Sequence, residues 1–304
     1  MLTLEHIQAA AQRIAPHIHR TPVLTSQGLD RLLGHRLFFK AEHLQKTGSF
    51  KARGALNAAL QLQNPKGIIA VSSGNHAQGV AYAAQVLGVP ALVVMPQDAS
   101  PAKKSATRAY GAEVFDRGVT VGNREQVVRQ LAEETGYALI HPFDDLRVMA
   151  GQGTLALELL EQVPELEAVL VAVGGGGLIS GIATVIKTLR PECEVIGVEP
   201  EGANDAQQSL QVGVRVKLMQ APKTVADGVR TLVIGERTFP VMQNFVDRIV
   251  TVPDQVTLEA QRLMMERLKQ VVEPTAGLAL GPLLMDYGLP QRAAVIVCGG
   301  NWLP

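Results

Sequence analysis

Residues 168–189 read Ala-Val-Leu-Val-Ala-Val-Gly-Gly-Gly-Gly-Leu-Ile-Ser-Gly-Ile-Ala-Thr-Val-Ile-Lys-Thr-Leu, two apolar runs separated by four glycines. The first run, 168–173, has no polar member, which predicts a strand at the centre of a sheet. The second run, 178–189, predicts a helix. The N–H groups of the glycine turn and the positive end of the helix could together bind a compact phosphate group.

Two other interpretations of the glycine turn stay open. It is not a P-loop, because no Gly-Lys-Ser/Thr follows, and Ile179 and Ser180 stand where a dinucleotide fingerprint has its third glycine. A dinucleotide site is still an alternative, since Glu199 ends the next predicted strand, where a ribose-binding acid would stand. The third interpretation is a tight strand-to-helix turn without a ligand.

The order of strand, turn and helix repeats along the chain. Apolar runs at 36–40, 68–71, 92–95, 112–115, 194–199, 249–252 and 293–297 alternate with helix-like segments. This alternation predicts an α/β fold with parallel sheets and helices on their faces. We expect a small inserted domain at 67–144 and a large domain formed by 1–66 and 145–304.

Composition excludes several classes of function. The 304 residues are 47% hydrophobic, with 28 basic and 28 acidic side chains, as in a globular enzyme without the basic surface of a nucleic-acid binder. The apolar runs are far shorter than the ~20 residues that cross a bilayer. Two cysteines make no disulfide framework, and the first residues lack the pattern of a signal peptide. We therefore expect a cytoplasmic protein with neither nucleic-acid nor membrane partners.

Lys51 lies in the segment Thr47-Gly-Ser-Phe-Lys-Ala-Arg-Gly54, just before a helix-like run. If Ser49 caps that helix, Lys51 lies in its first turn, where the positive end of the helix dipole lowers the pKa of the amine. An unprotonated lysine can attack a carbonyl and form a Schiff base. The alternative is a solvated surface lysine, which is the commoner state.

Two more turns follow predicted strands. Ser72-Ser73-Gly74-Asn75-His76 follows the strand 68–71, and Cys298-Gly299-Gly300-Asn301 follows the strand 293–297. The carboxyl ends of parallel strands meet at one edge of a sheet, so the turn 72–76 should face the same crevice as the glycine turn. Taken alone, the turn 72–76 could also be an ordinary polar turn, and a buried cysteine more often packs than reacts.

Together, Ser49-Phe50-Lys51, the turn 72–76, the glycine turn and the turn 298–301 resemble the fold-type II pyridoxal-phosphate enzymes, most closely the serine racemase and threonine dehydratase group. The resemblance covers nearly the whole chain. It implies two three-layer open-sheet domains of the tryptophan synthase β-subunit type, a small-molecule amino-acid substrate and a homodimer.

The resemblance also implies roles toward the cofactor, pyridoxal 5'-phosphate. Lys51 would hold it as a Schiff base and then act as the base that moves the substrate's α-proton. Asn75 would bond the ring hydroxyl, and Cys298 would face the pyridine nitrogen, where the family usually carries Ser or Thr. Because a thiol is not a carboxylate, that nitrogen should stay largely unprotonated, which suits elimination better than transamination. The other cofactor contacts would come from Phe50, Gly174, Gly175, Gly176, Gly177 and Leu178.

Roles toward the substrate follow from the same resemblance. Ser73 matches the racemases, in which this serine is the acid or base on the face opposite the lysine; bacterial threonine dehydratases tend to carry alanine there. Arg124 aligns with an arginine of the racemase type that reaches toward the β-substituent, although it could equally be a solvated arginine beside Glu125. The implied substrate-binding residues are Ser72, Ser73, Gly74, His76 and Arg124.

The segment 199–205 resembles the divalent-cation site of this group. The carboxylates of Glu199 and Asp205 and the carbonyl of Ala203 would be the ligands, and such oxygen ligands suit Mg²⁺ or Ca²⁺. This interpretation of Glu199 replaces its role as a ribose-binding acid.

The resemblance therefore predicts an ammonia-lyase that converts L-threonine and L-serine into 2-oxobutyrate and pyruvate plus ammonia, with additional serine racemase activity. Two alternatives lie within the group: a dedicated serine racemase, or a hydroxyaspartate dehydratase if Arg124 pairs with a second substrate carboxylate. Two lie outside it: a non-catalytic protein that binds a phosphate ligand, and a nicotinamide-dependent dehydrogenase.

Overall fold

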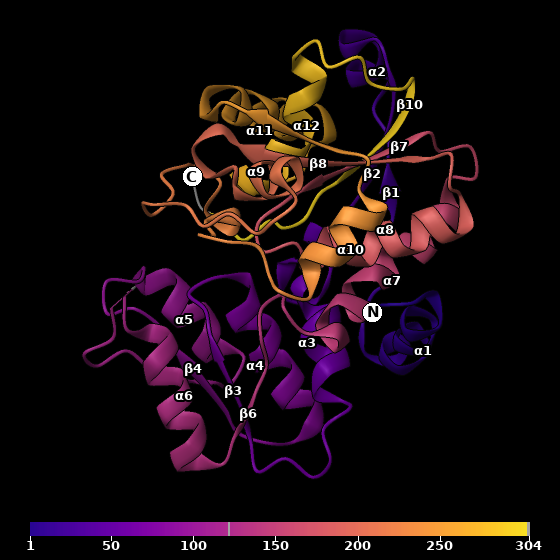
Figure 1. Cartoon of the computed structure of the whole chain (residues 1–304). Coiled ribbons are helices and arrows are strands. Elements are labelled where there is room, and N and C mark those ends of the chain that lie inside the picture. Colours follow the sequence, from indigo (N-terminus) through magenta and orange to yellow (C-terminus); the bar gives the residue numbers. More distant parts are fainter. Residues whose placement is uncertain (121, 303–304) are drawn as a thin grey trace.

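The computed structural model describes residues 1–120 and 122–302, which include two β-sheets (Figure 1). The larger sheet has six strands, in the spatial order β1 (Val23–Leu24), β2 (Arg36–Lys40), β10 (Arg292–Ile296), β7 (Ala168–Ala172), β8 (Glu194–Pro200) and β9 (Arg248–Val252). Its strands pair in parallel, except for the antiparallel pair β1 and β2. All five residues of β7 are buried, which confirms the predicted central strand.

The smaller sheet has four parallel strands in the order β5 (Glu113–Phe115), β4 (Ala91–Val94), β3 (Ile68–Val71) and β6 (Ala138–Leu139). Alternate residues of β3 and β4 belong to two different apolar clusters, so both faces of this sheet are covered. Apolar residues of 51–59 share one of these clusters with β3. The boundary expected at 66/67 therefore stays a prediction, since the core of the small sheet extends beyond it.

Twelve α-helices lie within the described residues. They are α1 (Leu4–Ile14), α2 (Gln27–Leu33), α3 (Lys51–Ala59), α4 (Asn75–Leu87), α5 (Pro101–Ala109), α6 (Arg124–Thr135), α7 (Leu146–Gln162), α8 (Gly177–Leu189), α9 (Asp205–Val212), α10 (Thr238–Phe245), α11 (Asp254–Leu268) and α12 (Pro274–Leu280). In Figure 1, α11 and α12 lie on one side of the large sheet, and α7, α8 and α10 lie on the other. This arrangement confirms the predicted α/β open-sheet architecture. None of these helices is long and apolar enough to cross a membrane.

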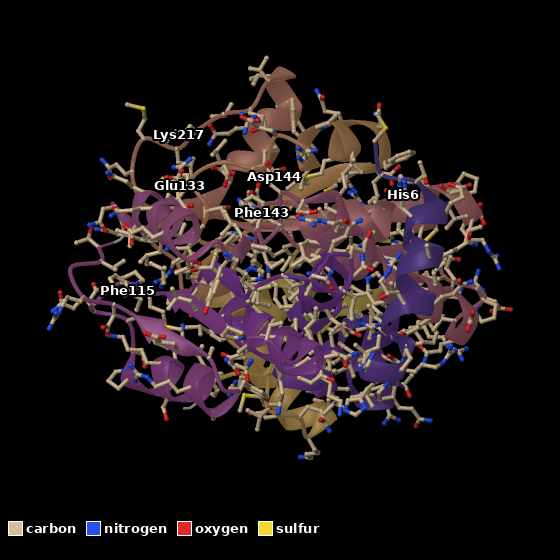
Figure 2. All side chains as sticks on the ribbon, turned by 90° about the horizontal axis from the view of Figure 1, so that it is seen from below. His6, Phe115, Glu133, Phe143, Asp144 and Lys217 are labelled. Atoms are coloured by element: carbon tan, nitrogen blue, oxygen red, sulfur yellow. The ribbon has the colours of Figure 1, made fainter. Side chains whose placement is uncertain are left out.

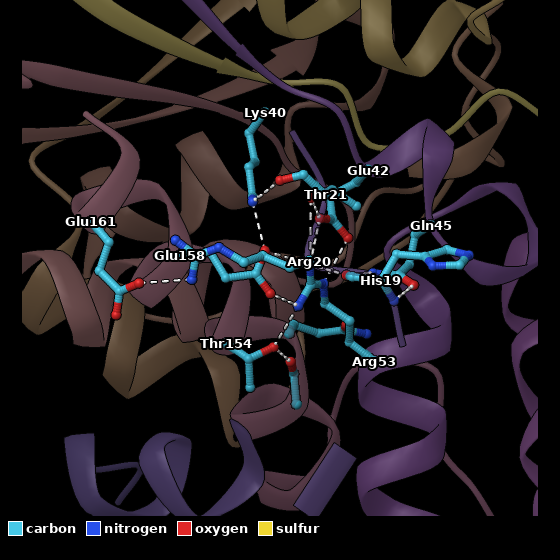
Figure 3. Close-up of polar contacts among 12 residues, drawn as sticks. His19, Arg20, Thr21, Lys40, Glu42, Gln45, Arg53, Thr154, Glu158 and Glu161 are labelled. Carbon is cyan, nitrogen blue, oxygen red and sulfur yellow. Dashed lines mark hydrogen bonds and ion pairs between the residues drawn. The ribbon is translucent and has the colours of Figure 1, made fainter. Parts of the chain in front are cut away.

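Helix α3 joins the two sheets, because it packs against both α4 and α7. Its Arg53 side chain has no exposed surface and lies at the centre of a buried polar network (Figure 3). The guanidinium donates to both carboxylate oxygens of Glu42 at 2.8 Å and to Glu158 at 2.7 Å. Lys40 donates to the other oxygen of Glu158 at 2.6 Å. We call Arg53, Glu42, Glu158 and Lys40 the Arg53 network; it holds the start of α3 against β2 and α7.

Candidate active site

Lys51 is the first residue of α3, as the sequence predicted, but Ser49 does not cap the helix. The N-cap is Phe50, which makes no side-chain capping bond. Ser49 has extended backbone angles and forms an antiparallel bridge with Gly299, and its buried hydroxyl has no partner among the described residues. The prediction of a serine cap was therefore wrong: strand-like pairing with the chain end holds the residue in place of a helix cap.

The amine of Lys51 is not a solvated surface charge. Its Nζ donates to the carbonyl of Pro142 at 2.8 Å and lies 5.1 Å from the centroid of the Phe50 ring. Burial lowers the pKa of Lys51 to about 8, while the nearby Cys298 and Glu273 act in the opposite direction. A pKa near 8 leaves an appreciable fraction of neutral amine at neutral pH, which is what attack on a carbonyl requires.

The glycine turn connects β7 to α8 and leaves no space for side chains. A Cβ on Gly175 would lie 2.3 Å from the ring of Phe143, and Gly176 has a φ of +87°, which other residues rarely adopt. The carbonyl of Gly175 accepts bonds from Gly235 N at 3.2 Å and from Thr238 Oγ1 at 2.8 Å. Within the described residues, the N–H groups of 175–178 donate to no protein acceptor. The turn is therefore rigid and presents free donors at a helix N-terminus.

The loop 142–144 brings Lys51 and the glycine turn together. Pro142 accepts the bond from the lysine amine, and the next residue, Phe143, packs on the glycines. Asp144 then accepts bonds from the backbone N–H groups of 236 and 237 at 3.0 and 2.7 Å. Figure 2 shows Phe143 and Asp144 beside each other near the middle of the molecule. No local sequence pattern indicated this loop.

The turn 72–76 opens helix α4. The Gly74 N–H donates to Ser72 Oγ at 3.2 Å, and Ser73 lies partly exposed beside it. The Nε2 of His76 contacts the carbonyl of Ile140 at 2.9 Å, so this nitrogen carries the proton. Burial and the nearby Lys51 lower the pKa of His76 to about 3, so the ring is neutral. The effect of Lys51 on this pKa indicates that His76 lies close to the lysine. The neutral ring, bonded to Ile140, supports the turn.

Asn75 and Cys298 meet at Glu273, a residue that the sequence analysis missed. Asn75 Nδ2 donates to both Glu273 oxygens at 3.0 Å, and Cys298 Sγ lies 3.8 Å from Glu273 Oε1. Glu273 is buried at the N-cap of α12, and burial raises its pKa to about 7. In the sequence, Glu273 is marked only by its position before Pro274, which is typical of a helix start. The long sequence separation from Asn75 hides their contact.

Three other predicted residues lie at the surface or against the core. Arg124 begins α6 with about a third of its side chain exposed, and its Nε lies 3.9 Å from Glu125 Oε1. This is the surface pairing that the sequence also allowed, and a substrate contact of Arg124 remains a prediction. Leu178 and Phe50 pack against the core of the large sheet.

Glu199 and Asp205 are both fully buried. Glu199 accepts bonds from the N–H groups of Ala206 and Gln207 at 3.0 and 2.8 Å, whereas neither oxygen of Asp205 has a partner in the described part of the chain. Burial raises the pKa of Glu199 to about 8 and that of Asp205 to about 7. Across residues 1–120 and 122–302, no group of three or more His, Cys, Asp or Glu side chains could hold a metal. The predicted cation site has two carboxylates and remains a prediction.

The chain is similar to known proteins over nearly its full length. Residues 14–299 match the family model described as "Pyridoxal-phosphate dependent enzyme". The L-threo-3-hydroxyaspartate ammonia-lyase of Saccharomyces cerevisiae is 48% identical over 297 residues, covering 96% of this chain and 91% of that protein. The serine racemase of Arabidopsis thaliana is 44% identical over 305 residues, covering 97% and 92%. The solved structure of a threonine deaminase from T.th. is 61% identical with a TM-score of 0.97, covering 99% of this chain and all of that one.

With Lys51 linked to a rigid glycine turn through the loop 142–144 and relatives of this closeness over nearly its full length, the chain belongs to the family of pyridoxal-phosphate dependent enzymes, in the group of the ammonia-lyases and racemases.

Proposed function

We propose that this enzyme removes water and ammonia from L-threonine and L-serine, giving 2-oxobutyrate and pyruvate, and that it also racemises serine. The observation that carries this proposal is the bond from Lys51 Nζ to Pro142, next to the residue that packs on the glycine turn. The lowered pKa of Lys51 and the unused N–H groups of the glycine turn support this proposal. The relative named threonine deaminase, 61% identical, supports the choice of substrate.

The residues present fit pyridoxal phosphate. The glycine turn has unused N–H groups and positions at which a Cβ would collide, which suits a phosphate, and Lys51 suits the aldehyde. Asn75 would supply a donor for the ring hydroxyl, and Cys298 would supply a thiol for the pyridine nitrogen. When bound, pyridoxal phosphate supplies an electron sink for negative charge at the substrate's α-carbon.

The chain's own groups would perform the proton transfers. The neutral Lys51 amine would take the α-proton of the substrate, and the N–H groups of the turn 72–76 would bind its carboxylate, since the start of α4 attracts negative charge. Racemisation needs a second proton carrier on the opposite face, and we assign that role to Ser73. The neutral His76 would support the turn rather than carry charge.

A second candidate substrate is 3-hydroxyaspartate. The observation in its favour is Arg124, whose guanidinium has only a weak, 3.9 Å contact with Glu125 and is thus available for a second substrate carboxylate. The relative named L-threo-3-hydroxyaspartate ammonia-lyase is 48% identical, which supports the same choice.

One set of assays distinguishes these activities. Formation of 2-oxo acid should be measured with L-threonine, L-serine and L-threo-3-hydroxyaspartate, and formation of D-serine with L-serine. Ser73→Ala should remove D-serine formation and retain 2-oxo acid formation from L-threonine. Arg124→Gln should raise the KM for hydroxyaspartate alone if the second candidate is right. No 2-oxo acid from any of the three substrates would exclude the proposal.

We also propose that a divalent cation binds between Glu199, Asp205 and the Ala203 carbonyl. The unpartnered, buried oxygens of Asp205 support this, because a cation would satisfy them. Mg²⁺ or Ca²⁺ should raise the melting temperature after EDTA treatment, and Asp205→Asn should remove that increase. An equal increase in the variant would disprove the site.

A further inference from the structure

Glu273 contacts both Asn75 and Cys298, the two residues proposed to contact the cofactor ring. Its carboxylate accepts from Asn75 Nδ2 at 3.0 Å through both oxygens, and Cys298 Sγ lies 3.8 Å from Oε1. Only 5% of the residue is exposed. Its backbone N–H donates to the carbonyl of Gly299 at 3.1 Å, and a Cβ on Gly299 would lie 2.7 Å from the carboxyl group. The carboxylate is therefore held in one place.

These contacts determine the direction of the Asn75 amide. An ionised carboxylate can only accept hydrogen bonds, so the Asn75 amide must turn its nitrogen toward Glu273. The Nδ2 of Asn301 donates to Asn75 Oδ1 at 2.8 Å, so the amide oxygen faces Asn301. The two oxygens of one carboxylate subtend a far smaller angle at Nδ2 than the roughly 120° between its N–H bonds. One N–H of Asn75 therefore serves Glu273, and the other stays free for a ligand.

The same carboxylate determines what Cys298 can offer. Burial and the negative charge of Glu273 raise the pKa of the Cys298 thiol well above its usual value, so the thiol keeps its proton. An S–H beside a carboxylate donates to it, which leaves only sulfur lone pairs for another neighbour. If Glu273 takes up a proton, it can itself donate, and the S–H is released.

We propose that Glu273 is a positioning residue. When ionised, it directs one N–H of Asn75 toward the cofactor ring and keeps the S–H of Cys298 on itself; when protonated, it releases that S–H toward the ring. This inference rests on the proposed placement of the ring between Asn75 and Cys298. With a pKa raised to about 7, Glu273 is protonated below neutral pH and ionised above it.

Four other groups influence the charge of Glu273. Lys51 on α3 and Lys103 on α5 are cationic neighbours, while Asp227, in the short helical turn Asp227–Val229, is an anionic one. Lys103 and Asp227 form an ion pair with each other. Cys298 remains a neutral thiol. Asp227 raises the pKa of Glu273 and Lys103 lowers it.

The test is a pH titration of the holoenzyme, followed by the absorption of bound pyridoxal phosphate between pH 5.5 and 8.5. We expect one step in the wild type, with a midpoint near 7, and its loss in Glu273→Gln. Asp227→Asn should move the midpoint to lower pH, and Lys103→Met should move it to higher pH. Opposite shifts would place the titrating group beside Asp227 and Lys103, as expected of Glu273, even if Glu273→Gln fails to fold.

The possible results separate two kinds of failure. A step that persists in Glu273→Gln, or one that neither Asp227→Asn nor Lys103→Met moves, would overturn the inference alone. A wild type whose cofactor absorption does not change with pH would also overturn the inference. A wild type that binds no pyridoxal phosphate would overturn the proposed function, and this inference with it.

Discussion

Replacing Arg53 by methionine should destabilise the protein more than any change at its surface. Methionine keeps an unbranched side chain and removes the charge. It leaves Glu42, which has no exposed surface, with the Thr21 hydroxyl at 2.6 Å as its remaining side-chain partner. Glu158 keeps its bond to Lys40. The loss therefore falls mainly on one buried carboxylate.

The expected loss of stability in Arg53→Met follows from the burial of this ion pair. Removing one partner of a buried ion pair costs about 3–5 kcal/mol, because the other charge stays buried without compensation. An unfolding entropy of about 2.1 cal/mol/K per residue amounts to about 0.6 kcal/mol/K for 304 residues. The melting temperature should therefore fall by about 5–8 °C.

Thermal unfolding of the holoenzyme, followed by circular dichroism, measures this change. The matched control is Arg20→Met, because Arg20 pairs with Glu161 (Figure 3). Their distance is 2.7 Å, but the two side chains are 55% and 65% exposed. That pair should contribute about 1 kcal/mol at most, which corresponds to less than about 2 °C. Equal shifts in the two variants would refute the reasoning, since burial would then have no effect on the cost.

Three further predictions concern the cofactor site. Lys51→Ala should lose the absorption at about 410 nm expected of a lysine-bound cofactor and keep its far-ultraviolet circular dichroism; a variant with unchanged absorption would exclude Lys51 as the attachment point. The rate at which pyridoxal phosphate reacts with the apoenzyme should rise about tenfold per pH unit and level off above pH 8, because only the neutral amine attacks and the pKa of Lys51 is lowered to about 8; stopped-flow absorbance measures it, and a flat profile from pH 6 to 8 would contradict the assignment. Gly175→Ala should cost about 1–3 kcal/mol and weaken cofactor binding, because its Cβ would lie 2.3 Å from the Phe143 ring; Gly28→Ala, whose nearest atom is 3.7 Å away, should melt no lower than the wild type.

Local pattern was enough to identify several elements. The all-apolar run 168–173 contains the buried strand β7, and the glycines after it lead directly into α8. Lys51 lies in the first turn of a helix, as expected, and the helix expected from Ala77 begins two residues earlier, at Asn75. These predictions succeed because apolar periodicity and glycine-rich turns act within a few residues of the chain. Family resemblance rests on the same short motifs.

Tertiary structure alone decided how these motifs combine. The lowered pKa of Lys51 comes mainly from burial rather than from the helix dipole that the sequence suggested, and burial depends on how α3 packs between the two sheets. Glu273 meets Asn75 across 198 positions of sequence, and no local pattern records such a contact. The sequence by itself determined where strands, turns and reactive side chains begin. Which of them share a buried site, and with what charge, was decided by long-range packing, because desolvation and hydrogen bonding depend on neighbours in space.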